Sequence, residues 1–416
     1  MTNQEKKPQY NIEMKIGNED MSPRVKSVII SNSIRSNCQN FIIEFEASEQ
    51  ELLQKNISGQ DTVKLRIERL PMGGDADEQH DFNLTILKMD NDSKPYGQNE
   101  VQPPNKGKVT IVCAVKEAWE CLTTPVNYFS KNTKKETPFE VAKNIADKFL
   151  KKCKNEIDRK GSNNFKPEQI VIPPMNFSKS LDYLDKKYGI YQGVTYYTSY
   201  TEDNEVKFNM FDLGQKIKDP PIFLLLVIPP GTPVPKEAYS VAGILDTFYY
   251  TFSPSVKKIS GNVSSAYTGS SSVFISKDPD KLFEKVEMKS EDVFKKVLPK
   301  SKGKLLVDES SKKTKTFNST DFSATSDNTS AITSSMAKKM FEQFGNNYKL
   351  EGVIKFKNLK KVGLPIQLIE LSDEGKAISG SYLIKNSIIS LKRNSSHFVG
   401  TATIGLIRSN LPDQNE

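Results

Sequence analysis

The chain has 416 residues, of which 36% are hydrophobic and 26% are charged. That length exceeds what one ordinary hydrophobic core supports, so we expect roughly two to four domains. The 59 basic and 51 acidic residues leave a net charge of +8 that is spread along the chain, which argues against a dedicated nucleic-acid-binding protein.

Residues 1–125 are predicted to be β-structure. The first seven residues hold no apolar stretch, so no secretory signal is expected. Apolar and polar residues then alternate, as half-buried strands require, and we expect strands at 10–16, 25–34, 41–45, 63–70, 82–88 and 108–115. About six strands with short links favour a small closed barrel, because closure removes exposed sheet edges.

Helical patterns begin after residue 125. Thr137 is suited to cap a helix, Pro138 to occupy its first position and Glu140 to complete a capping box. Apolar residues follow at helical spacing as far as Leu150, with lysines between them. The pattern predicts an amphipathic helix.

A second helix is expected to begin near Ser178 or Ser180 and to end before Gly189. An alternating strand at 194–200 then turns and returns as a second strand at 206–211. Together with the first helix, these elements predict a compact α+β insertion at 126–215.

The next part of the chain mixes strands with polar sequence. Its apolar run at 222–228 is far shorter than the roughly 20 residues of a membrane-spanning helix, so it is predicted to be a buried strand. A Ser/Thr/Lys-rich insertion, partly flexible, is expected at 256–345. Within and around it we predict a strand at 247–252, a helix at 281–298, an exposed linker at 308–335 and one or two helical turns at 337–344.

Order is expected to return near the C-terminal end, where the chain again becomes β-rich. Alternating or apolar runs predict strands at 350–356, 365–371, 381–391 and 401–408. These strands are typical of a small antiparallel barrel or half of one.

No combination of residues predicts catalysis, a cofactor or a metal. The two histidines, His80 in a polar loop and His397 in a turn, lack a neighbouring nucleophile and carboxylate. Glu202, Asp203 and Glu205 form a carboxylate cluster, but Asn204 among them makes a tight turn the simpler interpretation. We therefore expect no enzyme, no catalytic residue and no bound cofactor.

Cysteine spacing leads to a similar conclusion. The four cysteines lie far apart without any Cys-x-x-Cys pair, and they are Cys38, Cys113, Cys121 and Cys153. The spacing fits neither a zinc site nor a disulfide framework, so we expect buried, reduced thiols in a protein made in a cytoplasm.

An aromatic run stands out between the second helix and its following strand. Its candidate partner-contact residues are Tyr191, Tyr196, Tyr197 and Tyr200. Alternation along a strand places neighbouring tyrosines on opposite faces, so one face is expected to pack on the helix and the other to be free for a partner. Core packing plus a protein interface is favoured over stacking on bases or sugars.

Several short motifs resemble one family. The passage Leu181-Asp-Tyr-Leu to Val194-Thr-Tyr196, with Tyr188-Gly189-Ile190-Tyr191 inside it, is similar to the helix-to-strand passage of baseplate hub proteins of contractile-tailed phages. That family includes the late-control protein D group and the hub part of type VI secretion spike proteins. The segments 363–370, 380–384 and 398–408 resemble its last barrel. A histidine that members often carry after the Gly-x-Tyr strand is replaced here by residues 388–391.

The resemblance implies a mainly β protein with two tube-like antiparallel β-barrels and peripheral inserted domains. The first barrel would be 1–125, and the second would combine 216–255 with 346–410. Three copies would then present six barrels, so a homotrimer joins a three-fold central spike to the six-fold tail tube. Implied partners are the spike protein, the tail tube, other baseplate proteins and a tape-measure protein. The genome would pass through the lumen without specific binding. The expected location is the tail baseplate of the virion, after synthesis in the host cytoplasm.

Two other functions remain open at this point. A β-rich receptor-binding or adhesion module of the same particle would use the Ser/Thr-rich stretch for recognition loops. A cell-wall-degrading hydrolase would need a working carboxylate such as Glu202.

Overall fold

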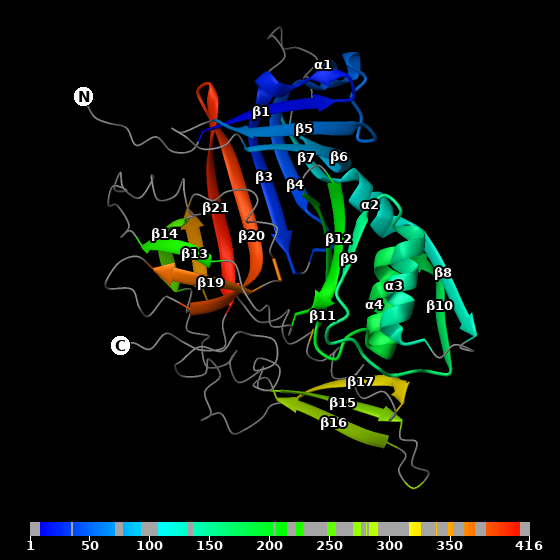
Figure 1. The fold of residues 1–416 in the computed structure, drawn as a ribbon. Coiled ribbons are helices and arrows are strands. Elements are labelled where there is room, and N and C mark those ends of the chain that lie inside the picture. The colour runs from blue at the N-terminus through cyan, green and yellow to red at the C-terminus, as the bar shows by residue number, and fades with distance from the viewer. Residues whose placement is uncertain are drawn as a thin grey trace.

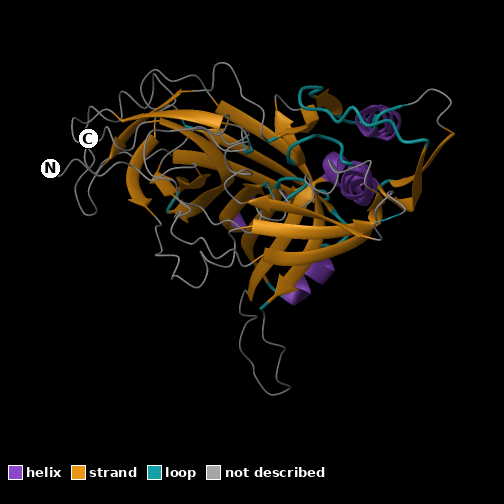
Figure 2. Cartoon of the chain, turned by 90° about the horizontal axis from the view of Figure 1, so that it is seen from below, coloured by secondary structure: helices purple, strands orange, loops and turns teal. Residues whose placement is uncertain are grey.

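A computed structural model describes most of the N-terminal half of the chain and selected segments of the C-terminal half. The described residues are 9–34, 36–70, 78–92, 107–131, 136–202, 205–213, 222–227, 248–254, 269–275, 280, 283–289, 316–325, 338, 348–352, 362–363, 365–370 and 380–407. Figure 2 shows that strands make up most of this part of the chain. The prediction of a mainly β fold is confirmed. No helix in these residues is long and apolar enough to cross a membrane.

Eight of the described strands pair into a closed ring, the first ring. Each strand pairs with the next until β1 meets β21, which pairs with β20 and completes the circle. All of these pairings are antiparallel. In order around the ring, the strands are β20 (Gly380–Asn394), β3 (Val25–Ser33), β4 (Asn40–Ala47), β7 (Gly107–Val115), β6 (Glu78–Asn91), β5 (Thr62–Arg69), β1 (Gln9–Ile16) and β21 (His397–Ile407).

Side-chain alternation explains why this ring closes around a packed interior. Along β1, exposed and buried residues alternate strictly, and β4 shows the same period of two. The inward side chains include Met14, Phe41 and Phe45, all fully buried. Burying one face of every strand removes apolar area from water, worth roughly 25 cal/mol per Å². Short elements at the ends of the ring are β2 (Glu19–Asp20), η1 (Ser22–Arg24) and α1 (Glu49–Gln54).

A second ring uses two strands of the first. β20 pairs with β19, and β21 pairs with β18, so six strands again form a closed circle. Its own strands are β13 (Ile222–Val227), β14 (Phe248–Pro254), β18 (Tyr348–Gly352) and β19 (Pro365–Glu370). In Figure 1 the β20–β21 hairpin lies between the two rings.

Closure of the rings differs from the sequence-based expectation in two ways. Residues 1–125 supply six strands of the first ring but do not close it, because β20 and β21 fill the remaining places. The second ring is not purely antiparallel, since β13 runs parallel to both β14 and β19. Parallel neighbours need long connections, and the chain between β13 and β14 and between β13 and β19 provides them.

The α+β insertion lies beside the first ring (Figure 1). Thr137 caps α3 and forms the predicted capping box with Glu140. α4 starts at Phe177, slightly earlier than predicted, because Asn176 rather than a serine caps it. α2 (Lys116–Thr123) leads from β7 into the insertion, whose elements are β8 (Pro125–Lys131), α3 (Pro138–Phe149), β9 (Lys154–Ile157), β10 (Gln169–Asn176), α4 (Phe177–Tyr188), β11 (Thr195–Glu202) and β12 (Glu205–Asp212).

A separate three-stranded sheet occurs within the Ser/Thr/Lys-rich insertion. It consists of β15 (Gly269–Ile275), β16 (Phe283–Lys289) and β17 (Thr316–Thr325). The predicted helix at 281–298 is wrong over β16, and the predicted linker at 308–335 is wrong over β17. Both short segments have ambiguous periodicity, and pairing with β15 satisfies their backbone groups as strands. The helical turns expected at 337–344 lie outside the described residues except Lys338.

Candidate interaction surfaces

The four tyrosines singled out in the sequence are all buried. Their exposed fractions are 0% for Tyr191, 3% for Tyr196, 4% for Tyr197 and 6% for Tyr200. Packing in the core, one part of the prediction, is confirmed. The expectation that one face of β11 would be free is wrong, because both Tyr196 and Tyr197 are covered by other parts of the chain. Direct contact of these side chains with a partner stays a prediction.

Tyr191 joins three elements of the insertion. Its hydroxyl donates to the backbone carbonyl of Asp158 at 2.6 Å and lies 3.0 Å from that of Met210 at the end of β12. The ring meets Phe139 of α3 edge-on, with centroids 5.7 Å apart. Burial raises the pKa of the Tyr191 phenol, so the hydroxyl remains a donor at neutral pH. Tyr191 is therefore an interior residue that connects α3, β12 and the residue after β9.

The other tyrosines hold β11 against different neighbours. The Tyr197 hydroxyl donates to the Asp182 carboxylate of α4 at 3.1 Å. The Tyr196 ring packs on Phe211 at 5.0 Å between centroids and lies under Gly363, where an added Cβ would be 2.8 Å from the Tyr196 ring. Gly363 has a φ of +85°, so glycine suits both its backbone and the close approach. The aromatic run therefore connects α4, β12 and the turn before β19.

Asp185 of α4 is a buried carboxylate that organises the chain after the helix. It accepts hydrogen bonds from the backbone N–H of Ile190 at 3.2 Å and from the Thr195 hydroxyl. Burial raises the pKa of the Asp185 carboxyl, while the charge of Lys338 and both hydrogen bonds act in the opposite direction. The motif found in sequence at 181–196 thus has a structural cause: Asp185 ties the helix end to the start of β11.

Asp185→Asn is expected to change how stability depends on pH. Because the folded pKa lies above the ordinary value of 3.8, the folded state binds more protons than the unfolded state in that interval. Stability contributed by Asp185 is therefore lost as pH rises from 3.8 through the folded pKa. Denaturant unfolding at several pH values should show the wild-type advantage over Asp185→Asn falling with rising pH. An advantage that grows with pH would contradict the raised pKa.

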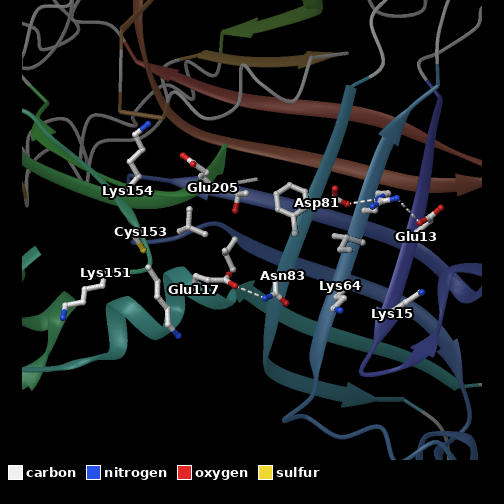
Figure 3. Close-up of a pocket in the computed structure, with 17 residues that line it drawn as sticks. Glu13, Lys15, Lys64, Asp81, Asn83, Glu117, Lys151, Cys153, Lys154 and Glu205 are labelled. Atoms are coloured by element: carbon white, nitrogen blue, oxygen red, sulfur yellow. Dashed lines mark hydrogen bonds and ion pairs between the residues drawn. The ribbon is translucent and has the colours of Figure 1, made fainter. Parts of the chain in front are cut away.

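A charged cleft of about 960 Å³ lies between the first ring and the insertion. Its wall on the ring comes from β1, β5, β6 and the end of β7, and its other wall comes from α2, the 151–154 segment, β11 and β12 (Figure 3). The charged residues lining it are Glu13, Lys15, Lys64, Arg66, Asp81, Glu117, Lys151, Lys152, Lys154 and Glu205.

Some charges in this cleft are paired within the chain. Arg66 bonds Asp81 at 2.7 Å, and its other end lies 3.9 Å from Glu13. Burial works to raise the pKa of Asp81, but hydrogen bonds from Arg66 and Gln79 outweigh it and leave that pKa below its ordinary value. Such exposed pairs contribute little stability, about 0–1 kcal/mol each.

Other cations at the cleft are exposed. Lys15, Lys64, Lys151 and Lys154 make no ion pair within the part of the chain that the structure describes. Figure 3 shows Lys15 and Lys64 on the opposite side of the cleft from Lys151 and Lys154. Exposed lysines therefore lie on both walls of the cleft. The alternation along β1 and β5 indicates which of their residues are exposed and could line a surface. It does not indicate that these strands lie opposite the lysine-rich 151–154 segment, because that contact depends on the fold.

The residues considered for catalysis are distributed without a shared centre. His80 lies within β6, not in a loop as predicted, and stacks near Phe82 with centroids 6.3 Å apart. Glu202 faces Glu205 across the hairpin and bonds Lys207 at 2.6 Å, which fits the predicted tight turn. Within the described segments, no group of three or more His, Cys, Asp or Glu residues is placed to hold a metal ion.

Comparisons with known proteins find likeness in structure rather than in sequence. No family model matches this sequence, and no curated protein matches it either. The 43 kDa tail protein of prophage MuSo2 from Shewanella oneidensis superposes with a TM-score of 0.52 and 11% identity, over 96% of this chain and 98% of that chain. The tail protein from Neisseria meningitidis has a TM-score of 0.48 and 12% identity, over 95% and 96% of the two chains. An Escherichia coli component of the type VI secretion system has a TM-score of 0.43 and 10% identity, over 95% and 76%. The Shewanella likeness shows that the fold is shared along nearly the whole chain.

Proposed function

We propose that this chain is a structural, non-enzymatic protein of a phage tail or a related contractile injection machine. In its specific role it is a tail hub: a homotrimer that joins a three-fold central spike to the six-fold tail tube. Its other partners are further baseplate proteins and a tape-measure protein, and the genome crosses its lumen without specific binding. It resides in the tail baseplate of the virion after synthesis in the host cytoplasm.

The pair of closed rings in one chain is the observation that carries this proposal. Three copies of a chain with two rings offer six rings, which fits a six-fold neighbour on one side and a three-fold neighbour on the other. Because both rings contain β20 and β21, each chain fixes the placement of one ring against the other. The fold shared with the Shewanella prophage tail protein supports the same proposal.

The charged cleft is our candidate contact surface for a neighbouring subunit or baseplate protein. Its walls belong to the first ring and the α+β insertion, so a segment bound there touches both parts. The domain division proposed from the sequence, with 126–215 and 256–345 as peripheral insertions, leaves the rings themselves available for the trimer and the tube.

Light scattering on the purified chain tests the trimer. The expected molar mass is three times the chain mass of 46.8 kDa, and negative-stain images should show a three-fold ring with a central channel. Co-expression with a spike protein serves as a second condition, since trimer formation can require that partner. A monomer at micromolar concentration under both conditions would contradict the hub proposal and would favour a receptor-binding module instead.

A further inference from the structure

Two cysteines that are remote in sequence meet beside the cleft. Cys121 lies in the last turn of α2, and Cys153 lies in the turn between α3 and β9. Their Sγ atoms are 3.2 Å apart, and the Cys153 thiol donates to the Cys121 sulfur. Both thiols are free in this structure.

We propose that Cys121 and Cys153 form a reversible disulfide when the folded chain meets an oxidising disulfide. A disulfide needs the two sulfurs at about 2.05 Å, so the side chains must approach by roughly 1 Å. The bond would tie α2, which packs on β6 and β7 of the first ring, to the turn of the insertion that leads into β9.

Neighbouring contacts hold the two segments in register for this bond. Lys152 and Glu120, the residues preceding each cysteine, form an ion pair of 2.7 Å. The Cys153 backbone N–H donates to the Leu150 carbonyl at 3.0 Å, which fixes the turn at the end of α3. The ion pair joins the two segments beside the sulfurs and the turn hydrogen bond orients Cys153, so oxidation requires only a local adjustment.

The two thiols differ in solvent access and in pKa. Cys153 is half-buried and lines the cleft, so a small disulfide can reach it, whereas Cys121 is buried behind it. The hydrogen bond from Cys153, helped by the backbone and charge of Lys152, lowers the pKa of the Cys121 thiol, while the pKa of Cys153 is raised. Cys38 and Cys113 are buried and do not line the cleft, and burial raises the pKa of Cys38 to about 11 and that of Cys113 to about 12.

The exchange balances with glutathione disulfide as the oxidant. Cys153 passes its proton to the hydrogen-bonded Cys121 sulfur and, as thiolate, attacks one sulfur of glutathione disulfide, which forms a mixed disulfide and releases one glutathione thiolate. Cys121 then loses its proton to the released thiolate through water and, as thiolate itself, attacks the Cys153 sulfur and expels the second glutathione thiolate. The two cysteines lose two electrons and two protons, and glutathione disulfide gains them as two thiols.

The test uses the folded, reduced, full chain incubated with glutathione disulfide, then alkylated and digested without reduction. Mass spectrometry should find one cross-linked peptide pair, Cys121 with Cys153, that disappears on reduction. Titratable thiols should fall from four to two per chain. The melting temperature should rise by a few degrees, because the bond restricts the unfolded chain. Cys38→Ala serves as the matched control and should form the same cross-link.

Single replacements separate the two roles. Cys121→Ser should accumulate a glutathione adduct on Cys153, because the second attack is lost. Cys153→Ser should acquire neither adduct nor cross-link. Four titratable thiols after oxidation of the unaltered chain would overturn the proposal. So would cross-links that involve Cys38 or Cys113 as often as the predicted pair, since those would report unfolding.

Discussion

Gly400→Val is expected to lower the free energy of unfolding by about 3 kcal/mol and to abolish assembly. Gly400 lies in β21, buried opposite Leu391 of β20. A Cβ at this position would lie 2.5 Å from the Tyr10 ring and 3.0 Å from Leu391. Tyr10 is 3% exposed and belongs to β1, so its ring has nowhere to move without disturbing the core.

The destabilisation by Gly400→Val is expected to be greatest where β1 pairs with β21 and closes the first ring. Among the residues that the structure describes, β1 pairs with β21 at two positions, Tyr10 with Phe398 and Gln9 with Val399. Valine adds three carbons between β1 and the shared hairpin, so relief of the clash separates these strands. Hydrogen exchange should therefore accelerate first in the amides of β1 and β21.

Denaturant unfolding followed by the fluorescence of Trp119, the single tryptophan, measures this change. Thr401→Val is the matched control, because Thr401 is the exposed neighbour in the same strand, and it should stay within about 0.5 kcal/mol of wild type. Tyr10→Ala combined with Gly400→Val should cost less than the sum of the two single changes, since removing the ring removes the clash. Full additivity would contradict the contact between Gly400 and Tyr10.

Tyr191→Ala is expected to lower the free energy of unfolding by about 3–5 kcal/mol. The change empties a fully buried site against Phe139 and removes the donor that serves the carbonyls of Asp158 and Met210. Loss of these contacts should release α3 from β12 and expose the insertion to proteolysis. Limited proteolysis with denaturant unfolding checks both parts of this expectation.

Tyr191→Phe separates packing from hydrogen bonding and also tests the partner-contact hypothesis. It keeps the ring and removes the hydroxyl, so the expected cost is about 1 kcal/mol. Because Tyr191 is interior, this variant should assemble like the wild type. A variant that is stable but fails to assemble would instead support direct contact between Tyr191 and a partner.

Local patterns predicted the elements whose causes are local. The capping box of Thr137 and Glu140 predicted α3, and the alternation of apolar and polar residues at 10–16 predicted β1 with the correct buried face. The closure of the first ring could not be predicted from the sequence, because the pairing of β1 with β21 joins residues nearly 400 positions apart and no local signal specifies it. The strand at Phe283–Lys289 was missed for the same reason: its partner strand, not its own periodicity, decides its conformation.

The candidate surfaces show the same division. The tyrosine run was recognisable as important, yet its burial depends on Phe211, Gly363 and other residues that arrive from distant segments. Cys121 and Cys153 were visible in the sequence but are 32 positions apart, and only the contact of α2 with the turn after α3 brings their sulfurs together. Rules based on sequence spacing detect pairs of cysteines that lie on one element, but they do not detect pairs that form between two different elements.

The β20–β21 hairpin also sets the order in which the chain can mature on the ribosome. β1 and β3 are made early, but one ring partner of each, β21 and β20 respectively, follows hundreds of residues later in the chain. At 5–20 residues per second, roughly 15–60 s pass between completion of β7 and completion of β21. During that interval the nascent sheet carries two open edges, each able to pair with another chain. Arrival of the hairpin caps both edges and seals the second ring in the same event, so maturation of the two rings is a single late step.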